Sequence, residues 1–192
     1  MLNTTKQRNA CEVSTRNNQF LELVRKWNKT AGLVAPGDLQ QLEDRHLHDS
    51  LALLDFVGNA RTLLDVGTGG GFPGIPLAIA VPHIEFTLVE RNLRKCSFLR
   101  HVVMTLDLTN VNIVNKDVRE LARPSKGFEV ITARAVAPPH RLWAWCRPLL
   151  AKEGRLLLQL SQSHPVPIEN AEVNLHDSSG VGFIGVVRQA GS

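Results

Sequence analysis

The chain has 192 residues, a length that fits one domain or one domain with a small N-terminal cap. Its hydrophobic content of 43% supplies a sizeable core, yet no apolar run is long enough to span a bilayer, and the polar N-terminus lacks the apolar region of a secretory signal. The three cysteines show no C-x-x-C spacing, which argues against a disulfide framework or a zinc site. We therefore expect a cytoplasmic protein without a metal.

The N-terminal part is predicted to be helical after a polar start. Residues 1–16 are expected to form a loose arm. A first helix is predicted over 18–29, where Phe20, Leu21, Val24 and Trp27 recur at helical spacing. A second helix is predicted over 39–57, with Asp38 as its N-cap.

From residue 62 onward, apolar strands alternate with helices. Strands are predicted at 62–66, 85–90, 111–115, 128–133 and 155–160, and helices at 75–81, 93–106 and 140–150. This alternation predicts an α/β fold with a mostly parallel sheet and helices on both faces. Segments 172–175 and 183–187 flank a turn-forming run at 177–180, which predicts an antiparallel C-terminal hairpin.

A D-x-G-x-G-x-G run begins at Asp65, at the end of the first strand. Gly67, Gly69 and Gly71 allow the backbone to turn tightly and to approach a ligand closely. A dinucleotide-binding loop usually has its third glycine where Phe72 stands, and the carboxylate of Asp65 would repel a pyrophosphate. That carboxylate suits a cofactor with cationic ammonium and sulfonium groups, namely S-adenosylmethionine.

Polar residues after the next two strands complete this prediction. Glu90 ends the second strand, where a carboxylate can accept hydrogen bonds from ribose hydroxyls. Asp117 and Val118 follow the third strand, where a carboxylate and a backbone N–H can bind an adenine edge. We include the neighbouring Arg119 in the cofactor pocket and expect Phe72 to shape its wall.

One stretch resembles a known family. The run from Leu64 to Ile79, with its G-F-P-G-I-P segment, is similar to the bacterial methyltransferases that modify guanine N7 in 16S ribosomal RNA, the glucose-inhibited division protein B family. The resemblance covers about residues 18–160. It implies a methyltransferase-type Rossmann fold, S-adenosylmethionine as cofactor, and ribosomal RNA or the small ribosomal subunit as partner. Supporting segments are Phe20-Leu21-Glu22-Leu23, Lys26-Trp27-Asn28-Lys29, Arg45-His46, Asp49-Ser50-Leu51, Val89-Glu90, Lys95, Phe98-Leu99 and Ala133-Arg134-Ala135-Val136-Ala137.

The chain departs from the family pattern at several positions. Gly32 replaces an Asn, and Leu160-Ser161 replaces a Lys-Gly pair. Asp117 stands where Arg is frequent, and Arg119 where Glu is common. Two other functions therefore remain open: a relative that binds the cofactor or RNA without catalysing methylation, and a small-molecule methyltransferase.

Guanine N7 carries an in-plane lone pair, so its methylation needs positioning rather than a general base. The fourth strand ends in Arg134, with neither a [DN]-P-P-[YFW] motif nor a cysteine nucleophile beside it. We expect the guanidinium to contact the cofactor, guanine O6 or a phosphate. The alternative is that Arg134 forms a salt bridge with a purely structural role at the end of the strand.

The charge of the chain is uneven. Residues 91–155 carry thirteen Lys and Arg but five Asp and Glu, which favours a polyanionic partner such as RNA. The candidate RNA-contacting residues are Arg91, Arg94, Lys95, Arg45 and His46. The alternatives are a solvated surface for the first three and simple packing for His46. We divide the chain into an arm and helical cap (1–58) and a cofactor-binding domain (59–192) within one compact unit, and expect a monomer.

Overall fold

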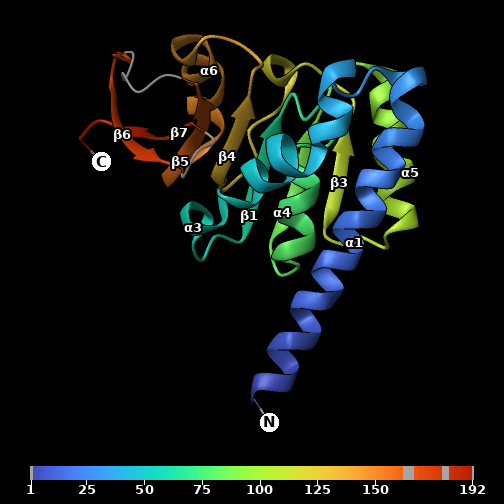
Figure 1. Ribbon diagram of the computed structural model, residues 1–192. Coiled ribbons are helices and arrows are strands. Elements are labelled where there is room, and N and C mark those ends of the chain that lie inside the picture. The colour runs from blue at the N-terminus through green and yellow to red at the C-terminus, as the bar shows by residue number, and fades with distance from the viewer. Residues whose placement is uncertain (1, 162–166, 179–181, 192) are drawn as a thin grey trace.

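The computed structural model of the chain describes residues 2–161, 167–178 and 182–191. Its centre is a seven-stranded sheet in the order β3-β2-β1-β4-β5-β7-β6 (Figure 1). Strands β1 to β5 are parallel, and β7 runs antiparallel to both of its neighbours. This confirms the mostly parallel sheet with an antiparallel C-terminal strand. The strands are β1 (Thr62–Val66), β2 (Glu85–Val89), β3 (Val111–Val114), β4 (Phe128–Arg134), β5 (Leu150–Leu160), β6 (Ala171–Asp177) and β7 (Phe183–Gln189).

Helices cover both faces of the sheet. Successive strand residues point to opposite faces, so Leu63 packs in a core with α1, α4 and α5, whereas Leu64 packs in a second core with α6. The α-helices are α1 (Leu2–Ala31), α2 (Asp49–Leu51), α3 (Leu54–Val57), α4 (Gly74–Ala80), α5 (Leu93–Thr105) and α6 (Pro139–Cys146). Three 3₁₀ segments, η1 (Pro36–Gln41), η3 (Val118–Glu120) and η4 (Arg147–Leu149), and one π-helical segment, η2 (Glu43–His48), complete the described elements.

The expectation of a loose arm over residues 1–16 is wrong, because α1 begins at Leu2 and continues to Ala31. The helix is anchored by Phe20, Leu21 and Val24, which are fully buried as expected. Extending an existing helix costs far less than starting one, so the polar residues before this anchor continue the same helix. Its first part projects away from the rest of the molecule (Figure 1).

The helix predicted over 39–57 is confirmed as helical backbone up to Leu51, but it is not one regular α-helix: 3₁₀ (η1), π (η2) and α-helical (α2) hydrogen bonding follow one another, and a turn at 52–53 precedes α3. Asp38 does not cap a helix. It lies inside η1, where its carboxylate accepts from Arg45 at 3.1 Å and contacts His46 at 3.2 Å. These contacts lie on helical backbone, since Leu42 and His48, at the junctions between η1, η2 and α2, keep right-handed helical angles.

Smaller differences occur near the C-terminus. The helix predicted to reach residue 150 ends at Cys146, and a 3₁₀ turn containing Pro148 follows it, since proline cannot continue the α-helical hydrogen bonds. Strand β5 accordingly begins five residues earlier than predicted, at Leu150. The predicted hairpin is confirmed by the pairing of β6 with β7. Part of its turn, residues 179–181, lies outside the described residues.

The N-terminal helices share a core with the sheet. Phe20, Leu42 and Leu53 belong to the same buried cluster as Leu63 and Leu88. The division of the chain at residue 58 stays a prediction. Among the described helices, none is both long and apolar enough to cross a membrane.

Candidate cofactor and substrate site

A pocket of about 500 Å³ lies at the carboxyl ends of β1, β2, β3 and β4. Strand β1 pairs with β2 on one side and with β4 on the other. The strand order therefore reverses at β1, and open α/β sheets place their ligands at such a point. Its walls include Gly67, Glu90, Asp117, Val118 and Arg134.

The glycine loop is attached to the end of β2. Gly67 and Gly69 have φ values of +63° and +58°, in the left-handed region that favours glycine. The Gly67 N–H donates to the carbonyl of Val89 at 2.8 Å, and the Gly69 N–H donates to Glu90 Oε2 at 3.1 Å. A Cβ at Gly69 would meet no described atom closer than 3.7 Å. Gly67 lines the pocket and Gly69 does not, but Gly69 has free space at its Cα next to Glu90.

Asp65 lies beneath the loop, fully buried. Its carboxylate accepts from the Gly74 N–H at 3.1 Å and from the Thr132 hydroxyl at 2.9 Å. Burial raises the pKa of Asp65 to about 6, against the lowering effect of these hydrogen bonds. Asp65 does not line the pocket in the described structure. It joins β1, β4 and the start of α4, and its direct contact with a cofactor stays a prediction.

Gly71 and Phe72 also lie behind the pocket rather than on its wall. A Cβ at Gly71 would come within 2.9 Å of Ile75 Cγ1, so this glycine allows close packing. The Phe72 ring packs against Phe20, with ring centroids 4.9 Å apart, and against His46 at 5.1 Å. Both residues hold the loop against the N-terminal helices.

On the far side of the pocket, Asp117 and Arg119 form an ion pair. The Asp117 carboxylate accepts from Arg119 Nε at 2.8 Å and from Nη2 at 2.7 Å. These bonds hold the pKa of Asp117 well below its usual range. The Arg119 guanidinium also lies 5.5 Å from the ring centroid of Trp145. Asp117, Val118 and Arg119, which the sequence predicts beside the adenine, thus form a preassembled group. Val118 is the first residue of η3.

Arg134 ends β4 and connects the pocket to the N-terminal segments. Its Nη1 donates to the Arg45 carbonyl at 3.3 Å and lies 3.9 Å from Asp49 Oδ2, and its Nη2 contacts His46 Nδ1. The guanidinium also lies 5.7 Å from the Phe72 ring centroid. The salt bridge that we considered as an alternative is thus present, but Arg134 also lines the pocket.

His46 supports Arg134 and has little surface of its own. It is only 9% exposed. Burial, followed by the charge of Arg134, lowers the pKa of His46. A neutral ring can accept from Arg134 at Nδ1 while it donates to Asp38 from Nε2. His46 thus contacts Arg134 inside the protein. Arg45, the other residue of this segment that was predicted to contact RNA, is exposed.

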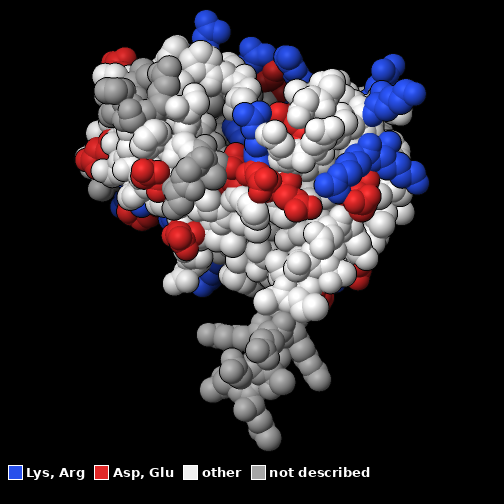
Figure 2. Space-filling model, in the orientation of Figure 1, with Lys and Arg blue, Asp and Glu red and all other residues white. Residues whose placement is uncertain are grey.

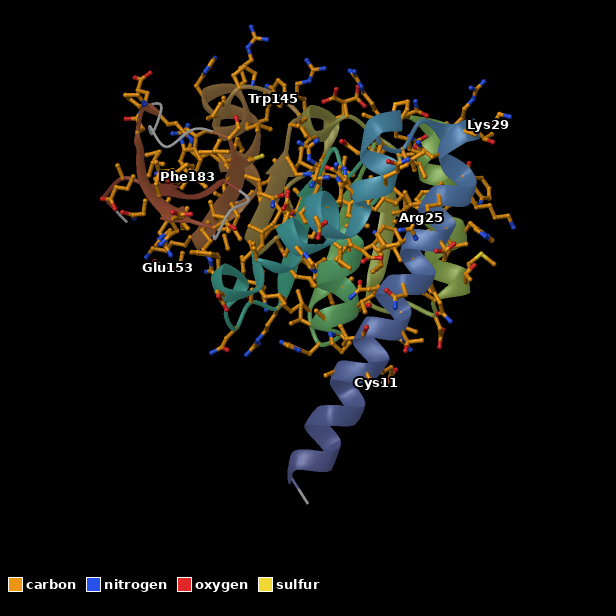
Figure 3. All side chains as sticks on the ribbon, in the orientation of Figure 1. Cys11, Arg25, Lys29, Trp145, Glu153 and Phe183 are labelled. Atoms are coloured by element: carbon orange, nitrogen blue, oxygen red, sulfur yellow. The ribbon has the colours of Figure 1, made fainter. Side chains whose placement is uncertain are left out.

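Positive charge surrounds the pocket. Of the predicted RNA-contacting residues, Arg91 and Lys95 line it, whereas Arg94 is exposed outside it. The six Lys and Arg residues in the lining outnumber its two carboxylates. Figure 2 shows Lys and Arg at the upper edge and the right-hand side of one face, with Asp and Glu across its middle; Arg25 and Lys29 of α1 lie on the right-hand side (Figure 3) and do not line the pocket. The six cations are Arg91, Lys95, Lys116, Arg119, Arg134 and Arg141.

Several lining residues were not among those predicted from the sequence. Arg141 and Trp145 come from α6 and are four residues apart, so they share one helical face. Their spacing, in the helix that follows Arg134, could have identified them. Trp145 is half-buried: it packs against the second core and also lines the pocket, at the upper edge of the molecule (Figure 3), whereas Trp143 is buried.

The lining fits an adenosine-bearing cofactor. The Glu90 oxygens each accept one backbone N–H, from Gly69 and from Asn92, and keep lone pairs for ribose hydroxyls. Gly67, on the pocket wall, has no side chain to obstruct a cofactor. Among the described residues, no group of three or more His, Cys, Asp or Glu side chains could hold a metal ion.

Two solved structures with a similar fold are named methyltransferases. A SAM-dependent methyltransferase from Aquifex aeolicus superposes with a TM-score of 0.59 at 16% identity, over 80% of this chain and 97% of that one. An O-methyltransferase from Brevibacillus brevis, solved with S-adenosyl-L-homocysteine, gives a TM-score of 0.52 at 22% identity, over 67% of this chain and 46% of that one. The sheet is thus that of the methyltransferase-type Rossmann fold.

Sequence comparison identifies closer relatives, each named ribosomal RNA small subunit methyltransferase G. The Gluconobacter oxydans protein is 38% identical over 170 residues, which cover 88% of this chain and 86% of that protein. The proteins of Marinobacter nauticus and Legionella pneumophila (strain Lens) are 42% and 40% identical, over 74% and 70% of this chain. These two matches span only 66% and 64% of the relatives' own length. The sequence profile described as rRNA small subunit methyltransferase G matches residues 14–179, and the chain belongs to that family.

Proposed function

We propose that this protein transfers a methyl group from S-adenosylmethionine to N7 of a guanine in 16S ribosomal RNA. The observation that carries the proposal is the pocket at the reversal of strand order, where the glycine loop and Glu90 lie beside six Lys and Arg residues. The relatives' names specify ribosomal RNA of the small subunit as the substrate of those proteins.

The cofactor residues would act in two groups. Glu90 would accept from the ribose hydroxyls, and the Val118 N–H, with Asp117 beside it, would bind the adenine edge. Asp65 would act by holding the loop in place through Gly74 and Thr132. Gly67, Gly69, Gly71, Phe72 and Arg119 would shape the pocket and its supporting walls.

When bound, S-adenosylmethionine supplies an electrophilic methyl group on its sulfonium. Guanine N7 presents its lone pair in the plane of the base, so the protein has to align the base and need not remove a proton. Arg134 is fixed from three sides by Arg45, His46 and Asp49, which gives it a defined orientation at the pocket wall. We therefore assign Arg134 the positioning of the base.

The partner would be ribosomal RNA or the small ribosomal subunit. The pocket lining has three times as many cationic side chains as carboxylates. Such a surface favours contact with the phosphates of RNA. This rim disfavours a small neutral substrate, the alternative that we left open. We further propose that the protein works as a monomer in the cytoplasm, where the ribosomal substrate is found.

One observation favours a second candidate, a relative that binds RNA without methylating it. Leu160 and Ser161, which replace the expected Lys-Gly pair, line a second pocket beside Arg134. If the missing lysine were essential for the substrate, binding of the cofactor would persist without transfer.

Methyl transfer by the purified protein separates the two candidates. Labelled S-adenosylmethionine is incubated with small ribosomal subunits that lack N7-methylguanine, and the RNA is then cleaved by a chemistry specific for that nucleotide. We expect label and cleavage at one guanine. In the Arg134→Lys variant, loss of the planar guanidinium should slow single-turnover transfer by about ten- to hundred-fold. Cofactor binding with no transfer to naked RNA or to subunits would favour the second candidate.

A further inference from the structure

A second pocket, of about 160 Å³, lies on the other side of Arg134. It is formed where β5 ends and β7 begins, by residues that include Gln159, Leu160 and Phe183, and it is closed by Asp49 of α2. Phe183, the first residue of β7, is labelled in Figure 3 and marks the position of this pocket. Arg134 lines both pockets, so whatever occupies the small pocket lies next to the cofactor pocket.

Two oxygen atoms in this wall have no hydrogen-bond donor. Asp49 Oδ1 and Gln159 Oε1 are buried and unpartnered within the described part of the chain. Gln159 uses its amide nitrogen to donate to the Asp49 carbonyl at 2.8 Å, which leaves its oxygen as a pure acceptor. A buried acceptor without a donor is costly. Both atoms have almost no solvent-accessible surface, so a ligand with two donors would remove that cost once each terminal group turns towards the pocket.

We propose that the second pocket holds the target guanine, with Asp49 and Gln159 accepting hydrogen bonds from its N1–H and its exocyclic N2 amine. The inference rests on the proposed function and adds the residues that select the base. Enzymes that modify a base commonly take it out of the stack into a close-fitting pocket and bind its Watson–Crick edge. The apolar side chains of Leu160, Phe183 and Ile184 supply walls for the faces of the ring.

The order of atoms around guanine would let a base in the second pocket reach the cofactor pocket. O6 lies between N1 and N7 on the edge of the base. When Asp49 and Gln159 bind N1 and N2, O6 points towards Arg134, whose guanidinium can donate to it. N7 then lies beyond O6, on the side of the cofactor pocket that Arg134 also lines. The base would thus present its reactive atom to the methyl donor.

The same wall would discriminate against adenine. Adenine presents an unprotonated N1, which would meet the oxygens of Asp49 or Gln159 as a second acceptor. Adenine also lacks O6, so the Arg134 guanidinium would face an amine. A site built to accept hydrogen bonds from a substrate rejects an analogue that lacks the donors.

Inosine provides the test, because it differs from guanosine only in lacking the N2 amine. Once the methylated nucleotide is mapped, small-subunit RNA is ligated with guanosine or inosine at that position, and single-turnover transfer to each is measured. We expect the unmutated protein to methylate the inosine RNA about tenfold or more slowly. Equal rates would overturn the inference and leave the proposed function standing, whereas no transfer to guanosine RNA would overturn both.

Two variants identify the residue that binds the amine. Gln159→Met removes an acceptor, and Asp49→Asn replaces the carboxylate by a weaker amide acceptor; the change at the residue that binds the amine should shrink the preference for guanosine to within about threefold. Asp55→Asn, the same change at an exposed position of α3, should keep the full preference. A preference that persists in both pocket variants would overturn the assignment. The guanosine-to-inosine ratio of the unmutated protein decides the question even if a variant fails to fold.

Discussion

The carboxylate of Glu90 and the backbone N–H of Gly69 are joined by a hydrogen bond of 3.1 Å, which ties the glycine loop to the end of β2. The other Glu90 oxygen accepts from the Asn92 N–H at 2.8 Å, and Asn92 caps α5. One side chain, only 8% exposed, therefore orders the loop and the helix that flank the proposed ribose position.

Replacement of this carboxylate tests its role. In Glu90→Gln, the amide NH₂ would face one of two backbone N–H donors, and a charge-assisted acceptor for the ribose is lost. We expect the Kd for S-adenosylhomocysteine, measured by titration calorimetry, to rise about ten- to hundred-fold. Glu153→Gln is the control, because Glu153 is exposed near the start of β5, away from the pocket (Figure 3). An unchanged Kd in a folded Glu90 variant would contradict the ribose assignment.

Gly69 and Gly32 form a matched pair for a test of the loop. Both have a φ of +58°, and neither has a described atom within 3.5 Å of the position of a Cβ. A Gly→Ala change therefore introduces similar backbone strain at each position. Only Gly69 lies in the loop beside Glu90. We expect Gly69→Ala to weaken cofactor binding by about tenfold or more, whereas Gly32→Ala lowers stability alone. Equal cofactor affinity in the two variants would contradict the loop assignment.

Asp65 predicts a pH dependence of stability. Its pKa is raised to about 6 in the folded state by burial. A carboxyl with a raised folded pKa stabilises the fold while it is protonated in the folded state, and this contribution is lost as the pH rises towards 6 and beyond. Relative to Asp65→Asn, the unfolding free energy of the unmutated protein should fall by about 1 kcal/mol between about pH 5 and pH 7.5.

Urea unfolding of both proteins at the two pH values measures this difference. The amide nitrogen of the replacement can donate to the Thr132 hydroxyl, so the variant should remain folded. Asp55→Asn, at an exposed site, gives the baseline for a surface carboxyl. A difference that does not change with pH would show that Asp65 is ionised throughout this range.

The basic rim predicts a strong salt dependence of RNA binding. Replacing Arg91 and Lys95 by Ala should weaken affinity for small-subunit RNA and reduce the slope of log K against log salt by about one to two. Lys126→Ala with Lys152→Ala removes the same charge near the amino ends of β4 and β5 and should leave the slope unchanged. Equal slopes in both double variants would contradict an RNA contact at the pocket.

The sequence predicted the sheet well because its strands are short apolar runs between clear breaks, such as Thr62–Val66 before the glycine loop. At residues 39–57 the hydrophobic spacing predicted helical backbone correctly up to Leu51, but not the change from 3₁₀ to π to α-helical hydrogen bonding. Side chains in this stretch pair with distant residues, as His46 does with Arg134 across a separation of 88 residues. Local periodicity carries no information on such pairs.

The candidate site also has parts that the sequence predicted and parts that depend on tertiary packing. The motif located Gly67 and Glu90 on the pocket wall, but it could not distinguish them from Asp65 and Gly71, which lie behind the wall. Which side of the chain a residue faces depends on the packing of α1 and α4 against the loop. The second pocket was missed because Asp49 and Gln159 are 110 residues apart and meet only in the folded chain.

Methylation of guanine N7 in 16S ribosomal RNA is tested most directly in cells. N7-methylguanine is mapped in that RNA from cells with and without the gene. We expect one methylated guanine that disappears on deletion, returns with the unmutated gene, and does not return with a Gly69→Val gene that yields a folded protein. An identical map with and without the gene would contradict the account.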